Sequence, residues 1–144
     1  MHIPITRLDP DAPMPSQAHA DDAGYDLHAN DDVVIAPKGG RALVPTGLAI
    51  AIPPSYAGLV LPRSGLALKR GVTVLNAPGL IDAQYRGELK VLLVNTDPED
   101  PYEIHRGDRI AQLVIQRVEY VEWQDVATLD ETTRDTFGFG SSGR

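Results

Sequence analysis

An acid and a tyrosine stand near the middle of the sequence with the spacing Asp-x-x-Tyr, as Asp82 and Tyr85. They belong to a stretch, Asn76 to Glu88, that proline and glycine punctuate between two short apolar runs. This pattern is typical of a β-hairpin arm. A carboxylate on such an arm is able to activate water, and the ring beside it is able to grip a small ligand. Asp82 is also interpretable as an ordinary turn acid, which an isolated Asp-x-x-Tyr favours.

A candidate anion site lies at Pro62 to Gly65, where an apolar strand ends and the one plausible helix, Ser64 to Lys69, begins. The free amides and dipole of a helix N-terminus attract negative charge, and Arg63 adds a cation. We predict Ser64 as the N-cap, with Gly71 beyond the helix end. A capping serine beside a surface arginine explains these residues equally well.

Asp26 lies inside a predicted strand, directly after the acidic pair Asp21 and Asp22. One such carboxylate is able to hold Mg²⁺ through water, because this ion keeps much of its hydration and takes further ligands from substrate phosphates. The calcium-loop spacing is absent. The four histidines show no metal-ligand spacing, so we expect no zinc site.

Gln112 interrupts an otherwise apolar segment, Ile110 to Leu113. A buried amide must find hydrogen-bond partners, either in the core or at a ligand. The core interpretation is slightly favoured on these residues alone.

The last residues carry a glycine pattern, Gly138 to Gly143, that formally matches the dinucleotide-binding motif, but no strand leads into it. The glycine amides, the hydroxyls of Ser141 and Ser142 and the guanidinium of Arg134 are still suited to phosphate. Taken alone, the segment is best interpreted as a disordered glycine-serine tail.

The elements that position these residues are short strands. Twelve prolines and thirteen glycines separate segments of alternating Val, Ile and Leu, which indicates an all-β fold of the jelly-roll or barrel type with one short helix. We expect a single domain over residues 1–129 and a mobile tail over 130–144. The predicted strands are Ile3 to Leu8, Tyr25 to His28, Val33 to Ile35, Ala42 to Ile52, Ala57 to Leu61, Val72 to Leu75, Leu89 to Asn95, Tyr102 to His105, Ile110 to Val118 and Val121 to Asp125.

Composition excludes several classes of function. A net charge of -7 argues against a non-specific nucleic-acid binder. The absence of cysteine removes disulfides, a thiol nucleophile and cysteine zinc sites. No signal peptide or membrane span is evident, so we expect a cytoplasmic protein without a membrane partner. The candidates that remain are two anion sites, one metal carboxylate and one base, which together match phosphate-ester hydrolysis.

Five segments, taken in order, resemble the motifs of the trimeric dUTP pyrophosphatases. The joint pattern is far more specific than any one segment and favours the functional interpretation of each. The segments are Ala23 to Leu27, Pro62 to Ala67, Asn76 to Glu88, Gly107 to Leu113, and Phe139 to Gly143 after Arg134.

This resemblance implies a jelly-roll homotrimer that hydrolyses dUTP to dUMP and pyrophosphate with Mg²⁺, with sites assembled from three chains. Such activity limits uracil in DNA and supplies dUMP for dTMP synthesis. By the match, Asp82 is the base for the water that attacks the α-phosphate. Asn76 and the hairpin backbone at Gly79 and Ile81 read the uracil edge, while Tyr85 packs on the deoxyribose and excludes a 2′-hydroxyl.

The resemblance assigns the phosphate chain to Arg63, Ser64, Gly65 and Gln112, and a water-mediated magnesium contact to Asp26. In the tail, the γ-phosphate clamp and the cover over the uracil fall to Arg134, Phe139, Gly140, Ser141 and Ser142. Family tails usually read Arg-Gly-x-Gly-Gly-Phe-Gly, and here Asp135 and Phe137 replace two of those glycines.

Two rival functions remain open. A dCTP deaminase shares the fold and the trimer, but the hairpin with Asp82 and the tail with Phe139 both favour the pyrophosphatase. The second rival is a non-catalytic regulatory homologue that keeps the nucleotide pocket.

Overall fold

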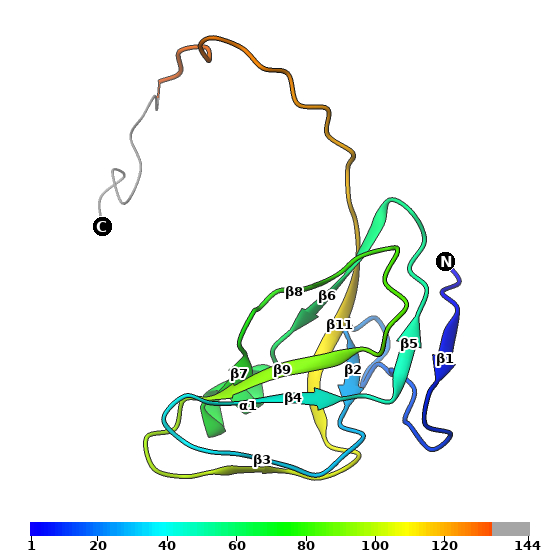
Figure 1. Cartoon of the computed structure of the whole chain (residues 1–144), viewed down its shortest axis with the longest axis vertical. Coiled ribbons are helices and arrows are strands. Elements are labelled where there is room, and N and C mark those ends of the chain that lie inside the picture. Colours follow the sequence, from blue (N-terminus) through cyan, green and yellow to red (C-terminus); the bar gives the residue numbers. More distant parts are fainter. Residues whose placement is uncertain (134–144) are drawn as a thin grey trace.

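The computed structural model describes residues 1–133 and confirms the all-β prediction (Figure 1). Within these residues the chain forms eleven strands and one helix. The elements are β1 (Ile5–Arg7), β2 (Tyr25–His28), β3 (Val33–Ile35), β4 (Gly40–Pro45), β5 (Leu48–Ile50), β6 (Tyr56–Leu61), α1 (Ser64–Arg70), β7 (Val72–Val74), β8 (Gly79–Ile81), β9 (Lys90–Asn95), β10 (Tyr102–Ile104) and β11 (Arg109–Arg117).

The strands pair into four antiparallel sheets that wrap around one core in a jelly-roll-like barrel. The largest sheet has the order β2-β11-β6-β8, and a second has the order β4-β9-β7. Two-stranded sheets, β1-β5 and β3-β10, complete the barrel. Because β11 lies between β2 and β6, residues far apart in sequence become neighbours on the largest sheet.

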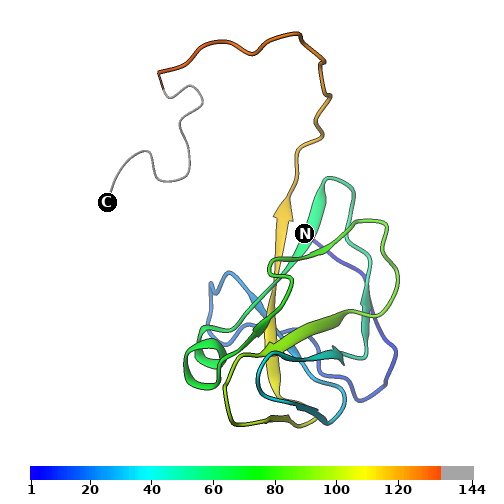
Figure 2. The ribbon, with the colours of Figure 1, turned by 60° about the vertical axis from the view of Figure 1, so that its left-hand side comes forward.

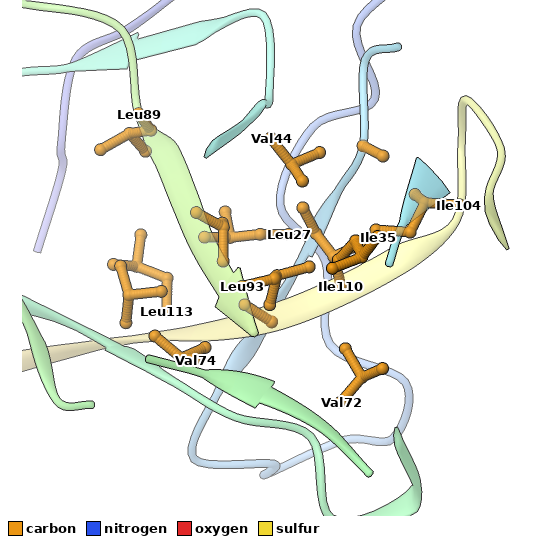
Figure 3. Close-up of a cluster of buried hydrophobic side chains, with 14 of the residues drawn as sticks. Leu27, Ile35, Val44, Val72, Val74, Leu89, Leu93, Ile104, Ile110 and Leu113 are labelled. Carbon is orange, nitrogen blue, oxygen red and sulfur yellow. The ribbon is translucent and has the colours of Figure 1, made fainter. Parts of the chain in front are cut away.

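The core is built from aliphatic side chains that each strand turns inward. In β9, Val91 and Leu93 are 1% exposed, and Leu27 of β2 is fully buried. Figure 3 shows side chains of β2, β3, β9 and β11 converging on this cluster. Burying one such side chain contributes about 1.5–3 kcal/mol, so the barrel gives the functional loops a rigid base.

The predicted hairpin around Asn76 to Glu88 is present at its base but differs in its arm. β7 and β9 pair antiparallel, with Val74 opposite Leu93. The arm strand β8 pairs instead with β6, where Gly79 lies opposite Val60. The arm is therefore held by the barrel wall rather than by its own returning limb.

Two strand predictions were wrong. The segment Ala42 to Ile52 is two strands, because Gly47 has a φ of +69°, which a continuous ladder does not accept. Residues 121–125 form no strand within the described part of the chain, although their apolar and polar residues alternate. A strand needs a neighbour for its backbone groups, and here the chain runs away from the barrel (Figures 1 and 2).

Candidate functional site

Asp26 is the buried acid of the largest sheet. It is 8% exposed, and two arginines face its carboxylate. Arg63 Nε lies 3.4 Å from Oδ1, and Arg109 Nη1 lies 3.2 Å from Oδ2. A buried carboxylate is costly without such partners, which explains why the strand tolerates it.

The two arginines are also linked to each other. Arg63 Nη1 donates a hydrogen bond of 2.9 Å to the backbone carbonyl of Arg109. Two guanidinium groups thus share one carboxylate, and their side chains remain 24% and 48% exposed. This cluster of Asp26, Arg63 and Arg109 carries a net positive charge, so it is suited to an anion with several oxygens.

A pocket of about 250 Å³ opens beside this cluster. Gln112 of β11 lies opposite Asp26 of β2, so the two side chains share a face of the sheet. Gln112 lines the pocket and is partly exposed, so of the two interpretations of its amide, the ligand one is favoured over the core one. The lining residues are Ala18, Asp22, Ala23, Gly24, Asp26, Arg63, Arg109 and Gln112.

The start of α1 differs from the prediction. Arg63, with φ −91° and ψ 123°, is the N-cap, and Ser64 is already the first helical residue. The Arg63 carbonyl accepts the Ala67 amide at 3.1 Å, so the helix begins one residue earlier than a serine cap requires. Ser64 and Gly65 are exposed next to the pocket wall but do not line the pocket. Gly71 ends the helix in the left-handed conformation, as predicted.

His28 lies two residues after Asp26, on the same face of β2. Its Nδ1 is buried and has no hydrogen-bond partner within residues 1–133. Burial lowers the pKa of His28, and the charges of Arg109 and Arg63 lower it further, against the opposing effect of Asp26. The imidazole is therefore neutral at pH 7 and adds no charge to the cluster.

The predicted base lies elsewhere in the chain. Asp82 follows β8, and its carbonyl accepts the Tyr85 amide at 3.1 Å. The Tyr85 hydroxyl donates to the Glu88 carbonyl at 2.9 Å. The side chain of Asn76 lies close to Gly79, since a Cβ on Gly79 would be 3.4 Å from Asn76 Nδ2. These contacts give the arm a defined shape.

The arm borders a second pocket, of about 280 Å³, which joins Asp82 and Tyr85 to apolar side chains and to one ion pair, Glu88 with Lys90. A small polar molecule with one apolar face fits such a lining. The lining residues are Leu43, Leu80, Ile81, Asp82, Tyr85, Glu88 and Lys90.

The two pockets have no lining residue in common among the described residues. One chain therefore brings together Asp26, Arg63 and Gln112, and separately Ile81, Asp82 and Tyr85. We name these the phosphate-type pocket and the arm pocket. Sequence reasoning missed Arg109, Glu88 and Lys90 as lining residues. The predicted tail residues Arg134, Phe139, Gly140, Ser141 and Ser142 lie outside the described residues.

The phosphate-type pocket fits the predicted Mg²⁺ in its donor chemistry. Two carboxylates, Asp22 and Asp26, and the amide of Gln112 offer oxygen donors, which Mg²⁺ prefers. Within residues 1–133, no group of three His, Cys, Asp or Glu side chains is placed to hold a metal ion. A cation beside Asp26 would therefore take most ligands from water and a bound anion.

No helix in residues 1–133 is both long and apolar enough to cross a membrane. A family model described as dUTPase matches residues 10–143. The chain belongs to the dUTPase family. The resemblance found in the sequence is thereby confirmed, and the match spans both pockets and the segment beyond the described residues.

Curated relatives are similar over nearly the whole chain. A deoxyuridine 5′-triphosphate nucleotidohydrolase of Corynebacterium efficiens is 60% identical over 142 residues, which cover 99% of this dUTPase-family chain and 78% of the relative. The enzyme of the same name from Nocardia farcinica is 57% identical over 141 residues, which cover 98% of this chain and 85% of that relative. Both relatives bear the name of a dUTP-hydrolysing enzyme.

Solved structures agree on the fold. The dUTPase of Staphylococcus bacteriophage 80alpha with dUpNHpp matches with a TM-score of 0.91 at 31% identity, covering 99% of both chains. A mutant dUTPase of phage phi11 of S. aureus, described with a structural Mg(II) ion, matches with a TM-score of 0.82 at 29% identity, covering 89% of this chain and 98% of the other.

Proposed function

We propose that this chain hydrolyses dUTP to dUMP and pyrophosphate, with Mg²⁺ and with Asp82 as the base. The family match over residues 10–143, which includes both pockets, carries this proposal. The reaction would limit uracil in DNA and provide dUMP for dTMP synthesis, and a cytoplasmic location remains our prediction.

The phosphate chain is assigned to the phosphate-type pocket. Arg63 and Arg109 supply charged donors that line one pocket and suit the oxygens of a polyphosphate, and Gln112 adds an amide. Asp26 would hold hydrated Mg²⁺, which supplies neutralisation of phosphate charge when bound. The arginines keep the Asp26 carboxylate in place for that contact.

The nucleoside is assigned to the arm pocket. Asn76 and the backbone at Gly79 and Ile81 would read uracil, and Tyr85 would pack on the deoxyribose. Asp82 would take a proton from water while the water oxygen forms a bond to the α-phosphorus. The bond from that phosphorus to the bridging oxygen breaks, and pyrophosphate leaves.

We also propose a homotrimer, and the separation of the two pockets in one chain supports this proposal. One substrate must reach both, so a neighbouring chain would supply the pocket that the first chain lacks at that position. Exposed apolar residues support association, since Trp123 is 90% exposed and Tyr120 is 79% exposed. An apolar hollow of about 490 Å³ near Tyr25 and Ile115 is a second unpartnered surface. The predicted tail clamp, Arg134 to Ser142, would close over the substrate.

A pyrophosphate-release assay across the common nucleoside triphosphates, with and without Mg²⁺, tests the proposal. We expect turnover of dUTP only, and its loss on chelation. Asp82→Asn should abolish turnover while keeping nucleotide binding, and a near wild-type rate would refute the base. Formation of dUTP from dCTP would instead indicate the deaminase, and binding of a non-hydrolysable dUTP analogue without turnover of dUTP would indicate a regulatory homologue.

A further inference from the structure

Glu88 connects the arm to the neighbouring turn between β4 and β5. Its Oε1 accepts the Gly47 amide at 2.9 Å, and its Oε2 lies 3.4 Å from Lys90 Nζ. Its backbone carbonyl accepts the Tyr85 hydroxyl at 2.9 Å. One residue thus binds the barrel through its side chain and the pocket tyrosine through its backbone.

The turn at Gly47, whose amide donates to Glu88, is held by several contacts of its own. Gly47 has a φ of +69°, and a Cβ there would lie 2.9 Å from atoms of Ala12 and Asn30. Its carbonyl accepts the Leu8 amide at 2.7 Å. The Gly47 amide is therefore positioned both by the N-terminal segment and by the hydrogen bonds of its neighbours Thr46 and Leu48 with Leu89.

Tyr85 has little else to hold it in place. It is 44% exposed, so packing restrains the ring only in part. The ring also needs a glycine at position 87, because a Cβ there would clash with the Tyr85 hydroxyl oxygen. Three hydrogen bonds then define where the tyrosine lies: its hydroxyl donates to the Glu88 carbonyl, its backbone amide donates to the Asp82 carbonyl, and its own carbonyl accepts from Arg86 Nη1.

We propose that Glu88 is a positioning residue that sets the placement of Tyr85, and hence the discrimination between deoxyribose and ribose. This inference rests on the proposed dUTP hydrolysis. The essential group is the hydrogen-bond acceptor that meets the Gly47 amide, and the ion pair with Lys90 is secondary because the Lys90 side chain is 44% exposed. Without the acceptor, the Glu88 backbone keeps only the hydrogen bonds of the adjacent Leu89 with Thr46 and Leu48, so the Glu88 carbonyl and the Tyr85 ring are held less firmly.

Two substitutions separate the acceptor from the charge. Glu88→Ala removes both, whereas Glu88→Gln keeps an oxygen that can accept the Gly47 amide. The test measures kcat/KM for dUTP and for UTP with each variant, with thermal midpoints alongside. Glu103→Ala, an exposed acid on β10 away from both pockets, is the matched control.

We expect Glu88→Ala to lower the dUTP-to-UTP ratio of kcat/KM about 10-fold, because small misplacements of a positioning group cost rates of that order. Glu88→Gln and Glu103→Ala should keep the ratio within about 3-fold of wild type, because both retain an acceptor for the Gly47 amide. A merely structural role would lower the thermal midpoint and leave the ratio unchanged. That result, or an equal loss in Glu88→Gln, would overturn the inference.

Two further measurements keep the inference testable by itself. Hydrogen exchange at the Gly47 and Tyr85 amides should accelerate in Glu88→Ala and not in Glu88→Gln, whatever the activity, and unchanged exchange would overturn it. Gly87→Ala displaces the same tyrosine with the Glu88 side chain intact and should lower the ratio as well. An unchanged ratio in Gly87→Ala would overturn the inference even if Glu88→Ala does not fold. If the wild-type protein does not hydrolyse dUTP, the proposed function is refuted. The exchange measurement does not depend on activity, so failure of the proposed function and failure of this inference are distinguishable.

Discussion

Gly24 and Gln112 fit together because Gly24 has no side chain. A Cβ on Gly24 would lie 2.7 Å from Gln112 Oε1 and 3.1 Å from Gln112 Cβ. Glycine at this place on the approach to β2 therefore lets the Gln112 side chain cross the neighbouring backbone and line the phosphate-type pocket. The relationship makes Gly24 a determinant of the site through the placement of Gln112, in addition to its own place in the pocket lining.

Gly24→Ala should move the Gln112 amide while leaving the barrel folded. The amide is the far end of a flexible side chain, so rotation relieves most of the clash. We expect kcat/KM for dUTP to fall roughly 10-fold, the cost of about one misplaced hydrogen bond, with a small change in thermal midpoint. Steady-state kinetics and thermal unfolding measure both quantities.

A double-mutant cycle shows whether the effect passes through Gln112. If it does, Gly24→Ala should cost little further activity in a Gln112→Ala background. Fully additive losses would show that Gly24 acts by another route.

Arg109→Met should weaken binding of the triphosphate more than it weakens the fold. The change removes one of two cations at Asp26 and one donor to the phosphate-type pocket. We expect KM for dUTP to rise about 10-fold and to depend less on salt, as for loss of a charged hydrogen bond. Because the Arg109 side chain is 48% exposed, the free energy of unfolding should fall by less than about 1 kcal/mol.

Arg117→Met supplies the control for that experiment, since Arg117 ends the same strand and its side chain is 70% exposed beside Glu119. It should leave KM near the wild-type value. An equal rise in both variants would mean that only net charge matters, and that the pairing of Arg109 with Asp26 does not.

The local features of this chain were accessible from sequence, and the pairings between distant segments were not. Alternating apolar residues predicted most strands, and the glycine after α1 predicted its end. The ion pair of Asp26 with Arg109 was not predictable from sequence. It depends on the register of β2 against β11, where a shift occurs between Arg109 and Ala111. A one-residue slip would turn Arg109 away from Asp26.

The link between Glu88 and Gly47 escaped sequence reasoning for a similar reason. The residues are 41 positions apart, and their contact depends on a break between β4 and β5 that the apolar run from Ala42 to Ile52 conceals. In contrast, Asp82 and Tyr85 were identified as a pair because two residues three positions apart on one arm remain close in almost any turn.

The contacts of Asp9 should make the free energy of unfolding depend on pH. A hydrogen bond from the Asp11 amide, a second from Asn30 and the Arg106 guanidinium at 2.8 Å lower the pKa of Asp9 below 3.8. The unfolded chain therefore binds more protons near that pH, and stability falls as pH drops through 3.8 toward the folded-state pKa. Asp9→Asn should flatten the acid side of the stability curve, measured by urea unfolding between about pH 3 and 6.

Asp11→Asn is a suitable comparison, because the Asp11 amide donates to Asp9 through the backbone and survives the substitution. It should retain the Asp9 contribution to the acid slope. If Asp9→Asn unfolds with the same pH profile as the wild type, the contacts of Asp9 do not stabilise the folded state.

Trp123, the single tryptophan of the chain, reports on the proposed trimer. It is 90% exposed in one chain, beyond the last strand and next to Val121, Glu122 and other residues that no strand covers. Exposing an indole ring of this size is unfavourable, so a neighbouring chain should cover it on association. Its fluorescence emission should then shift to shorter wavelength as protein concentration rises through the range of assembly.

Trp123→Ser should correspondingly weaken association, with a lower molar mass by analytical ultracentrifugation at equal concentration. Dilution should also lower activity, because the two pockets of a separated chain lie apart and no neighbouring chain completes either of them. Val34→Ser removes an exposed apolar residue from β3 and serves as the control, because Val34 is 65% exposed on the β3-β10 sheet, outside the segment that carries Trp123. A trimer whose tryptophan emits as in water, and whose mass Trp123→Ser leaves unchanged, would place this segment outside the interface and shift the search to the apolar hollow beside Tyr25.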